Sequence, residues 1–220
     1  MSIEDLLNKK EANSQRIYGV VTGIVTSNED EEGMGRVKIT FPWRGDKDEE
    51  KDETYWARVA SLMAGNDRGA VFYPEVDDEV LVAFEQGDIN YPYIIGALWN
   101  SKDKPPETNS DGKNNIRMIK SRSGHKIVLN DEQMKEKVEV ETNAGHKIIL
   151  DDATGQEKIQ IIDKTGSNKI IFDSMMNSIE IESTMKLKIK SQMIEIEAGA
   201  MMTIKANGIL TIKGSLVQIN

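Results

Sequence analysis

The 220-residue chain contains no cysteine, so neither disulfide bonds nor thiolate metal sites can stabilise it. Proline is absent from the second half, because all five prolines lie at or before Pro106. Proline removes a ladder hydrogen bond, so its absence suits uninterrupted strand pairing. Aromatic residues are also scarce there, since only Phe172 lies beyond Trp99. No apolar run approaches the roughly 20 residues that a membrane-spanning helix requires.

Basic residues are outnumbered by acidic ones, 28 to 37. The formal net charge is −9, and acidic side chains dominate residues 1–115, whereas the charges of residues 116–220 nearly cancel. A nucleic-acid-binding protein normally shows a basic surface, so no nucleic-acid partner is expected. Residues 1–16 are expected to form a polar arm in which Ser2 and Asp5 could cap a short helix. The arm lacks an apolar signal segment, which predicts a chain made in the cytoplasm and released by lysis or by a machine.

Residues 17–100 contain short β-rich segments separated by turn-rich loops. Alternation with period two is clearest in RVKITF at 36–41. Five short strands with long loops and no convincing helix predict a closed antiparallel barrel of the OB type. Polar residues 101–115 are expected to be a linker. The other strand candidates are 18–26, 55–61, 79–84 and 93–98.

The predicted barrel resembles the OB domain of phage baseplate assembly protein V, which the valine–glycine repeat protein G spikes of type VI secretion share. The resemblance rests on an ordered series of pieces that includes Phe41–Pro42–Trp43 and Trp56–Ala57–Arg58–Val59. The glycines are expected in turns, the tryptophans in or over the barrel, and the charged residues in pairs that fix loops. These motif residues, with structural rather than catalytic roles, are Gly35, Arg36, Trp43, Trp56, Arg58, Gly69, Pro74, Glu79, Phe84, Gly87 and Asp88.

Residues 116–220 contain internal repeats. SGHKIVLND, AGHKIILDD and GSNKIIFD each combine a turn glycine, a lysine and an apolar triplet, and Gly124, Gly145 and Gly166 are 21 residues apart. After Asn177 the period shortens to 7 or 8 residues through IEIE, LKIK, IEIE, MTIK, LTIK and LVQI. Apolar and polar residues alternate in each piece, so one face of each strand is expected to be buried. The expected core positions are Ile181, Ile189, Ile196, Ile204 and Ile212.

One copy of this region has too little interior of its own. Short strands with one apolar face cannot offset the entropy of ordering them, so neighbouring strands are expected from other copies. The family resemblance implies the same arrangement, namely a homotrimer whose residues 116–220 form an intertwined triple-stranded β-helix stalk. The whole chain is therefore expected to be all-β.

Charge alternates in sign along the polar face of the stalk. Glu180 and Glu182 are followed by Lys188 and Lys190, and then by a further glutamate pair at 195 and 197. Adjacent turns could therefore pair, although a merely solvated face explains the same residues.

No cofactor is expected. His125 and His146 occupy equivalent repeat positions and are the candidates for a metal ligand, but a surface or turn role is favoured for both. The His-x-His iron site found at the tip of some family members is absent. The end of the chain resembles instead the blunt apolar tip that a separate PAAR-repeat protein caps in other members, and three such ends would leave an exposed patch. The tip residues are Leu216, Val217, Gln218, Ile219 and Asn220.

The resemblance implies a structural spike and not an enzyme. The expected role is the central needle in the baseplate of a contractile phage tail or related injection system. The needle is expected to pierce the target envelope and to link a separate hub protein, bound at its N-terminal end, to the tip. A trimeric tail-fibre or adhesin module that binds glycan is the alternative, but it would favour exposed aromatics on the stalk. A polysaccharide-cleaving β-helix enzyme would need clustered carboxylates or basic residues on one strand face. Phage, phage-derived particle and secretion system stay equally open.

Overall fold

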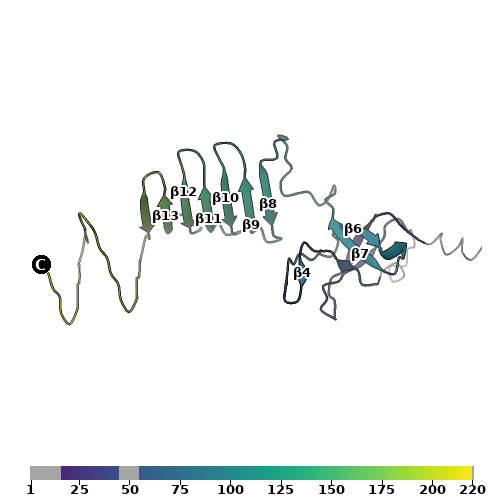
Figure 1. The fold of residues 1–220 in the computed structure, drawn as a ribbon, viewed down its shortest axis with the longest axis horizontal. Coiled ribbons are helices and arrows are strands. Elements are labelled where there is room, and N and C mark those ends of the chain that lie inside the picture. The colour runs from purple at the N-terminus through teal and green to yellow at the C-terminus, as the bar shows by residue number, and fades with distance from the viewer. Residues whose placement is uncertain (1–15, 45–54, 220) are drawn as a thin grey trace, which may run out of the picture. The chain divides into compact units, whose positions relative to one another are not determined.

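The computed structural model describes residues 16–44 and 55–219. The chain divides into two compact units, Met1–Thr108 and Asn109–Asn220 (Figure 1). Within the described residues, strands are the main regular structure, accompanied by one short 3-10 turn, η1 (Glu85–Gly87). No helix in this part of the chain is long and apolar enough to cross a membrane. The predicted N-terminal arm lies outside the described residues except for Arg16.

The first unit contains a five-stranded sheet in the order β2-β1-β6-β7-β3. Each predicted strand overlaps one of these five, although the third is reduced to two residues. Neighbouring strands are antiparallel, except that β3 runs parallel to β7. A small hairpin of β4 (Ala64–Gly65) and β5 (Arg68–Gly69), which the sequence did not predict, stands apart from the sheet. The five strands are β1 (Val21–Ser27), β2 (Lys38–Thr40), β3 (Arg58–Val59), β6 (Glu79–Phe84) and β7 (Pro92–Ala97).

One antiparallel bridge joins the two edges of this sheet. The amide of Val37 donates to the carbonyl of Ala57 at 3.0 Å, and the amide of Ala57 donates back at 2.7 Å. Val37 directly precedes β2 and Ala57 directly precedes β3, so the bridge closes the sheet into a small barrel. Closure leaves fewer unpaired backbone groups at the sheet edges. The buried core inside it is Val25, Val37, Ile39, Phe41, Ala57, Val80, Val82, Phe84 and Ile94.

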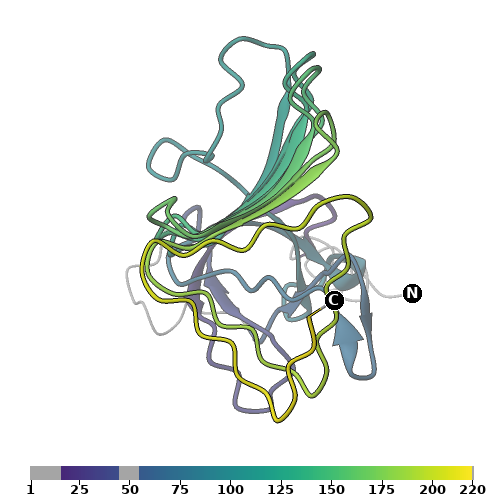
Figure 2. The same ribbon diagram turned by 90° about the vertical axis from the view of Figure 1, so that its left-hand side faces the viewer.

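The second unit is a seven-stranded antiparallel sheet in which every strand pairs with the next one along the chain. Figure 2 shows the strands stacked one behind another, so that the sheet presents two long faces. Its strands are β8 (Ile116–Lys120), β9 (Lys126–Asn130), β10 (Lys137–Glu141), β11 (Lys147–Asp151), β12 (Lys158–Ile162), β13 (Lys169–Asp173) and β14 (Ser178–Glu182).

Tight turns explain why these strands pair within one chain. Gly124, Gly145 and Gly166 have φ values of 92°, 94° and 72°, in the left-handed region that glycine enters readily. Each turn returns the chain directly beside the strand it has just left. This differs from the expectation that strand neighbours throughout residues 116–220 come from other copies. Residues 183–219 carry no assigned strand, and they run as wide open turns (Figures 1 and 2).

Candidate assembly surface

The seven-stranded sheet has one face made almost entirely of apolar side chains, called here the apolar face. Successive side chains on a strand point to opposite faces, and the cross-strand register aligns the apolar ones. Ile148 lies opposite Val140 on one side and Ile161 on the other. The alignment produces two continuous rows across the sheet. One row is Ile127, Val140, Ile148, Ile161, Ile170 and Ile181, and the other is Leu129, Val138, Leu150, Ile159, Phe172 and Ile179.

The apolar face is open to solvent in the isolated chain. Ile148 is 46% exposed and Leu150 is 44% exposed, whereas Ile39 in the barrel core is 0% exposed. Contiguous apolar patches beyond a few hundred Å² are rare on monomeric proteins and mark interaction sites. In the single chain, the described residues leave this face uncovered.

The opposite face of the sheet, called here the polar face, combines charged side chains with the aliphatic side chains of Val128, Ile149, Ile162 and Ile171. Glu139 is only 7% exposed there. Its carboxylate accepts hydrogen bonds from the ammonium groups of Lys137 at 2.8 Å and Lys147 at 3.1 Å. Burial alone would raise the pKa of Glu139, but the two lysines outweigh it and lower the pKa to about 2. Glu141 is similarly flanked, by Lys126 at 2.7 Å and Lys147 at 3.4 Å.

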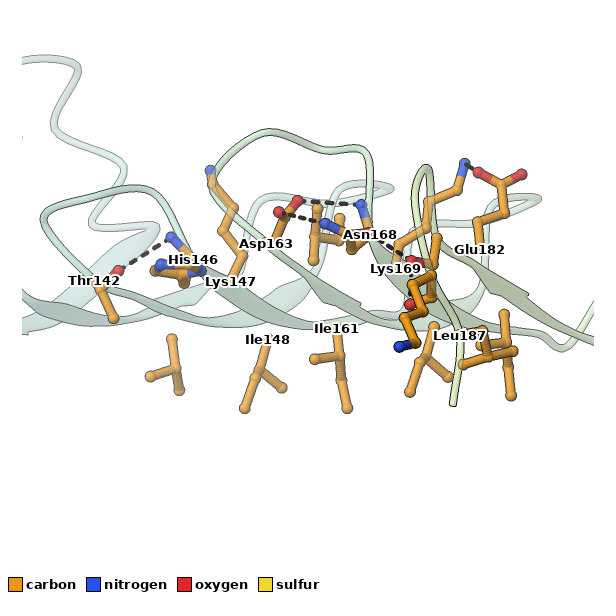
Figure 3. Close-up of a pocket in the computed structure, with 16 residues that line it drawn as sticks. Thr142, His146, Lys147, Ile148, Ile161, Asp163, Asn168, Lys169, Glu182 and Leu187 are labelled. Carbon is orange, nitrogen blue, oxygen red and sulfur yellow. Dashed lines mark hydrogen bonds and ion pairs between the residues drawn. The ribbon is translucent and has the colours of Figure 1, made fainter. Parts of the chain in front are cut away.

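The glycine turns are connected to one another by side-chain hydrogen bonds, and Figure 3 shows two of the side chains involved, those of His146 and Asn168. The Nδ1 atom of His125 accepts from the amide of Asn143 at 3.2 Å, and Nδ1 of His146 accepts from the amide of Lys164 at 3.3 Å. Asn168 continues the series, because its Oδ1 accepts from the hydroxyl of Ser183 at 3.0 Å. Both histidines therefore link one turn to the next.

The two candidate metal ligands of the sequence, His125 and His146, take part in contacts between turns. No group of three or more His, Cys, Asp or Glu side chains within 16–44 and 55–219 is arranged to hold a metal ion. The Nδ1 atoms of His125 and His146 are engaged by backbone amides of successive turns.

The predicted stalk-core residues are exposed in the single chain. Ile181 lies on the apolar face of β14, and Ile189, Ile196, Ile204 and Ile212 lie in the segment without strands, where each is at least 65% exposed. Leu187 contributes to a hollow of about 690 Å³ against the apolar face. The tip residues Leu216, Val217 and Ile219 are also exposed, and Asn220 is outside the described residues.

In the barrel, Arg36 is the centre of a polar cluster. Its guanidinium binds the carboxylate of Asp30 through two contacts, of 2.9 and 2.7 Å, and lies 5.7 Å from the ring centre of Trp56. The Asp30 carboxylate also accepts from the backbone amides of Glu32, Met34 and Arg36. The hydrogen bonds from Arg36 hold the pKa of Asp30 well below its usual range. Sequence reasoning missed Asp30, whose only signal was an acidic loop next to the motif arginine.

Two further motif residues fix the ends of the barrel strands. Arg58 lies over the ring of Tyr93 at 5.8 Å. The hydroxyl of Tyr93 donates to Glu85 at 2.6 Å, and this hydrogen bond raises the pKa of Tyr93. Glu79 accepts from the side-chain amide of Asn100 at 2.9 Å, where the chain leaves the barrel.

The remaining motif residues occupy turns, the core or its cover. The ring centres of Trp43 and Phe41 lie 5.4 Å apart, and those of Phe41 and Phe84 lie 5.7 Å apart in the core. Asp88 accepts from the amide of Asn90 in a turn. Gly35 and Gly87 have positive φ, and Gly69 lies in β5. Pro74 is buried, and its backbone carbonyl accepts a hydrogen bond from the side-chain amide of Asn28.

Geometry and sequence together define the class of the barrel. Residues 21–99 match the type VI secretion system/phage-baseplate injector OB domain. The barrel is therefore an OB domain of the kind that phage baseplates and type VI secretion injectors share.

Curated relatives share this domain. The chain is 35% identical over 79 residues to the type VI secretion system spike protein VgrG2a of Pseudomonas aeruginosa, covering 36% of this chain and 9% of that protein. It is 36% identical over 95 residues to spike protein VgrG5 of the same species, covering 41% of this chain and 12% of that protein. It is 34% identical over 82 residues to spike protein VgrG3 of Vibrio cholerae, covering 37% of this chain and 8% of that protein. The similarity thus spans only about a tenth of each of these relatives.

Proposed function

We propose that three copies of this chain assemble into the central spike of a contractile injection machine, in which the spike acts mechanically and not as an enzyme. The observation that carries the proposal is the open apolar face of residues 116–182, next in sequence to a barrel of the injector OB family. Three such faces packed around one axis would bury the rows that the single chain leaves in water. Residues 183–219 would then gain the strand neighbours they lack.

Burial of the apolar face supplies the driving force for assembly. Each fully buried Ile, Leu or Phe side chain stabilises by about 1.5–3 kcal/mol relative to an exposed one. Among the members of the two rows, Ile127, Leu129, Ile148 and Leu150 are each at least 43% exposed in one copy. The polar face remains outside, where its lysine and glutamate pairs keep the stalk soluble. The arrangement is a narrow, hydrogen-bonded rod that suits the transmission of axial force.

The partners follow from this role. A separate hub protein would bind the N-terminal end, and a PAAR-repeat protein would cap the exposed apolar residues Leu216, Val217 and Ile219. Sheath contraction would drive the rod into the envelope of a target cell. The chain would be made in the cytoplasm and leave it as part of a phage-like particle or a secretion machine.

The adhesin alternative has less support. Glycan-binding stalks use exposed aromatic side chains, and Phe172 is the only aromatic residue of residues 116–219. Phe172 lies on the apolar face, so assembly would bury it.

The mass of the full chain in solution tests the proposal. Light scattering coupled to gel filtration should give three times the chain mass of 24.6 kDa at micromolar concentration. A species of one chain mass, with a well-folded β-sheet spectrum and no tendency to associate, would reject the spike.

A further inference from the structure

The segment 175–202 is rich in methionine. It holds six of the eleven methionines of the chain, and it contains no proline and no aromatic residue. A mechanical rod does not require methionine, so the proposed function leaves this enrichment unexplained. The thioether of methionine is apolar, but peroxides oxidise it to a polar sulfoxide. The six are Met175, Met176, Met185, Met193, Met201 and Met202.

Met202 follows the pattern of the predicted stalk core. Ile194, Met202 and Leu210 succeed one another at intervals of eight residues, which is the spacing of the short repeats. Each of them also lies two positions before a predicted core isoleucine, and for Met202 this isoleucine is Ile204. Side chains two positions apart on an extended segment point to the same side. Met202 therefore shares a side with the core isoleucines.

The adjacent methionine, Met201, belongs to the other side of the segment. Met201 is 82% exposed in the single chain, whereas Met202 is 47% exposed. The same difference recurs one repeat earlier, where Met193 is 80% exposed and Ile194 is 54% exposed. The chain thus offers two neighbouring thioethers, of which one is half-exposed on the core side and the other is almost fully exposed.

We propose that Met202 is an oxidation site that hydrogen peroxide reaches in the single chain and that assembly of the stalk shields. The sulfur of Met202 attacks one oxygen of the peroxide, the O–O bond breaks, and the products are a methionine sulfoxide and water. The sulfur loses the two electrons that the peroxide gains, so the two reactants are sufficient. The inference rests on the proposed multi-chain stalk, because assembly is what buries the core side of this segment.

A sulfoxide at Met202 would oppose assembly. Burying a polar group without a hydrogen-bond partner is unfavourable, and the side chains of Ile194, Ile204 and Leu210 on the same side are hydrocarbons that donate no hydrogen bond. Three copies would bring three such sulfoxides into one interior, whereas a sulfoxide at Met201 would stay in water. The chain must therefore stay reduced until it assembles, and it resists peroxide at this site afterwards.

A time course of peroxide oxidation on the full-length chain tests the shielding. Hydrogen peroxide is added to the species that light scattering identifies as the trimer, and the sulfoxide at each methionine is quantified by peptide mass spectrometry. Met201 is the matched internal control, and Met34 of the barrel, which is 60% exposed, is a second one. Met202 should oxidise more slowly than either by on the order of tenfold. Urea that dissociates the trimer should remove the difference.

Substitutions test the consequence for assembly without an oxidant. Glutamine is a polar side chain of similar length to methionine, so it stands in for the sulfoxide. Met202→Gln should lower the melting midpoint of the trimer or leave a monomer, whereas Met201→Gln should melt as the wild type does. Met202→Leu keeps the site apolar and should assemble normally, which separates the effect of polarity from the effect of changing the residue.

Three results would overturn the inference and leave the spike intact. Equal oxidation rates at Met201 and Met202 in the trimer would show that assembly does not shield Met202. Equal midpoints for Met202→Gln and Met201→Gln would show that the site tolerates a polar group, and a Met202→Leu chain as unstable as Met202→Gln would show that polarity is not the cause. A wild type that is monomeric before peroxide is added would instead reject the spike itself.

Discussion

Glu139 gives the polar face a defined dependence on pH. Its folded-state pKa of about 2 lies below the ordinary value of 4.5, because Lys137 and Lys147 outweigh the effect of burial. The stabilisation is therefore complete above about pH 4.5 and is lost as the pH falls through about 2. Glu139→Gln should lower stability at pH 7 by on the order of 1–2 kcal/mol.

The difference in unfolding free energy between wild type and Glu139→Gln, measured in denaturant from pH 7 down to pH 2, checks this. The difference should shrink in acid. Gln160→Glu, on the same face, is a control that adds a carboxylate without removing one. A difference that stays constant with pH would contradict the role given to the lysines.

Gly69 is the residue that allows the β4–β5 hairpin to close. A Cβ atom built there would lie 2.7 Å from the backbone carbonyl oxygen of Met63, and a backbone atom cannot swing aside as a side chain can. Gly69→Ala should therefore destabilise the barrel by about 1–3 kcal/mol. Gly96→Ala is the matched control, since nothing lies within 4 Å of its added Cβ. Thermal melting of both variants measures the effect, and equal midpoints would refute it.

At the scale of the strand, the two faces of the sheet should respond oppositely to the same charge. Ile161→Asp places a carboxylate on the apolar face, where assembly would bury it unpaired at a cost of several kcal/mol per copy. Gln160→Asp, one residue earlier on β12, places it on the polar face. Gel filtration should show a monomer or aggregate for the first variant and an intact trimer for the second. Trimers of both variants would mean that the apolar face is not the contact.

The sequence predicted the barrel strands better than the pairing of the repeats. The glycine of each 21-residue repeat marked one turn, but the second turn of the repeat has no constant signal. Its left-handed position is held by Met134, Gly155 and Asn177 in successive repeats. With only one turn visible, each repeat could not be resolved into two strands of a hairpin. Alternation with period two, a purely local property, correctly predicted which side chains share a face.

The candidate surface was partly visible in the sequence as well. Ile181 was predicted as a core position and lies on the apolar face, and the apolar triplets pointed to the rows. The networks around Asp30 and Glu139 were not foreseen, because each depends on residues that only the register of neighbouring strands brings together. Lys147 reaches Glu139 from a position diagonal to it, and a one-residue shift in register would separate them.

At the scale of the whole molecule, the exposed end of the chain should determine which protein caps the spike. Leu216, Val217 and Ile219 have no core of their own, and three copies would gather them into one apolar patch. Deleting residues 216–220 should abolish capture of a PAAR-repeat protein while the trimer persists by light scattering, because the apolar face of residues 116–182 is untouched.

A matched variant separates lost contact from lost folding. Leu216→Asn with Ile219→Asn keeps the chain length and removes only apolar surface, so it should weaken capture in the same assay. Ile209→Asn, at another position that is 92% exposed, should leave capture unchanged. Capture that survives the deletion would show that the cap binds elsewhere.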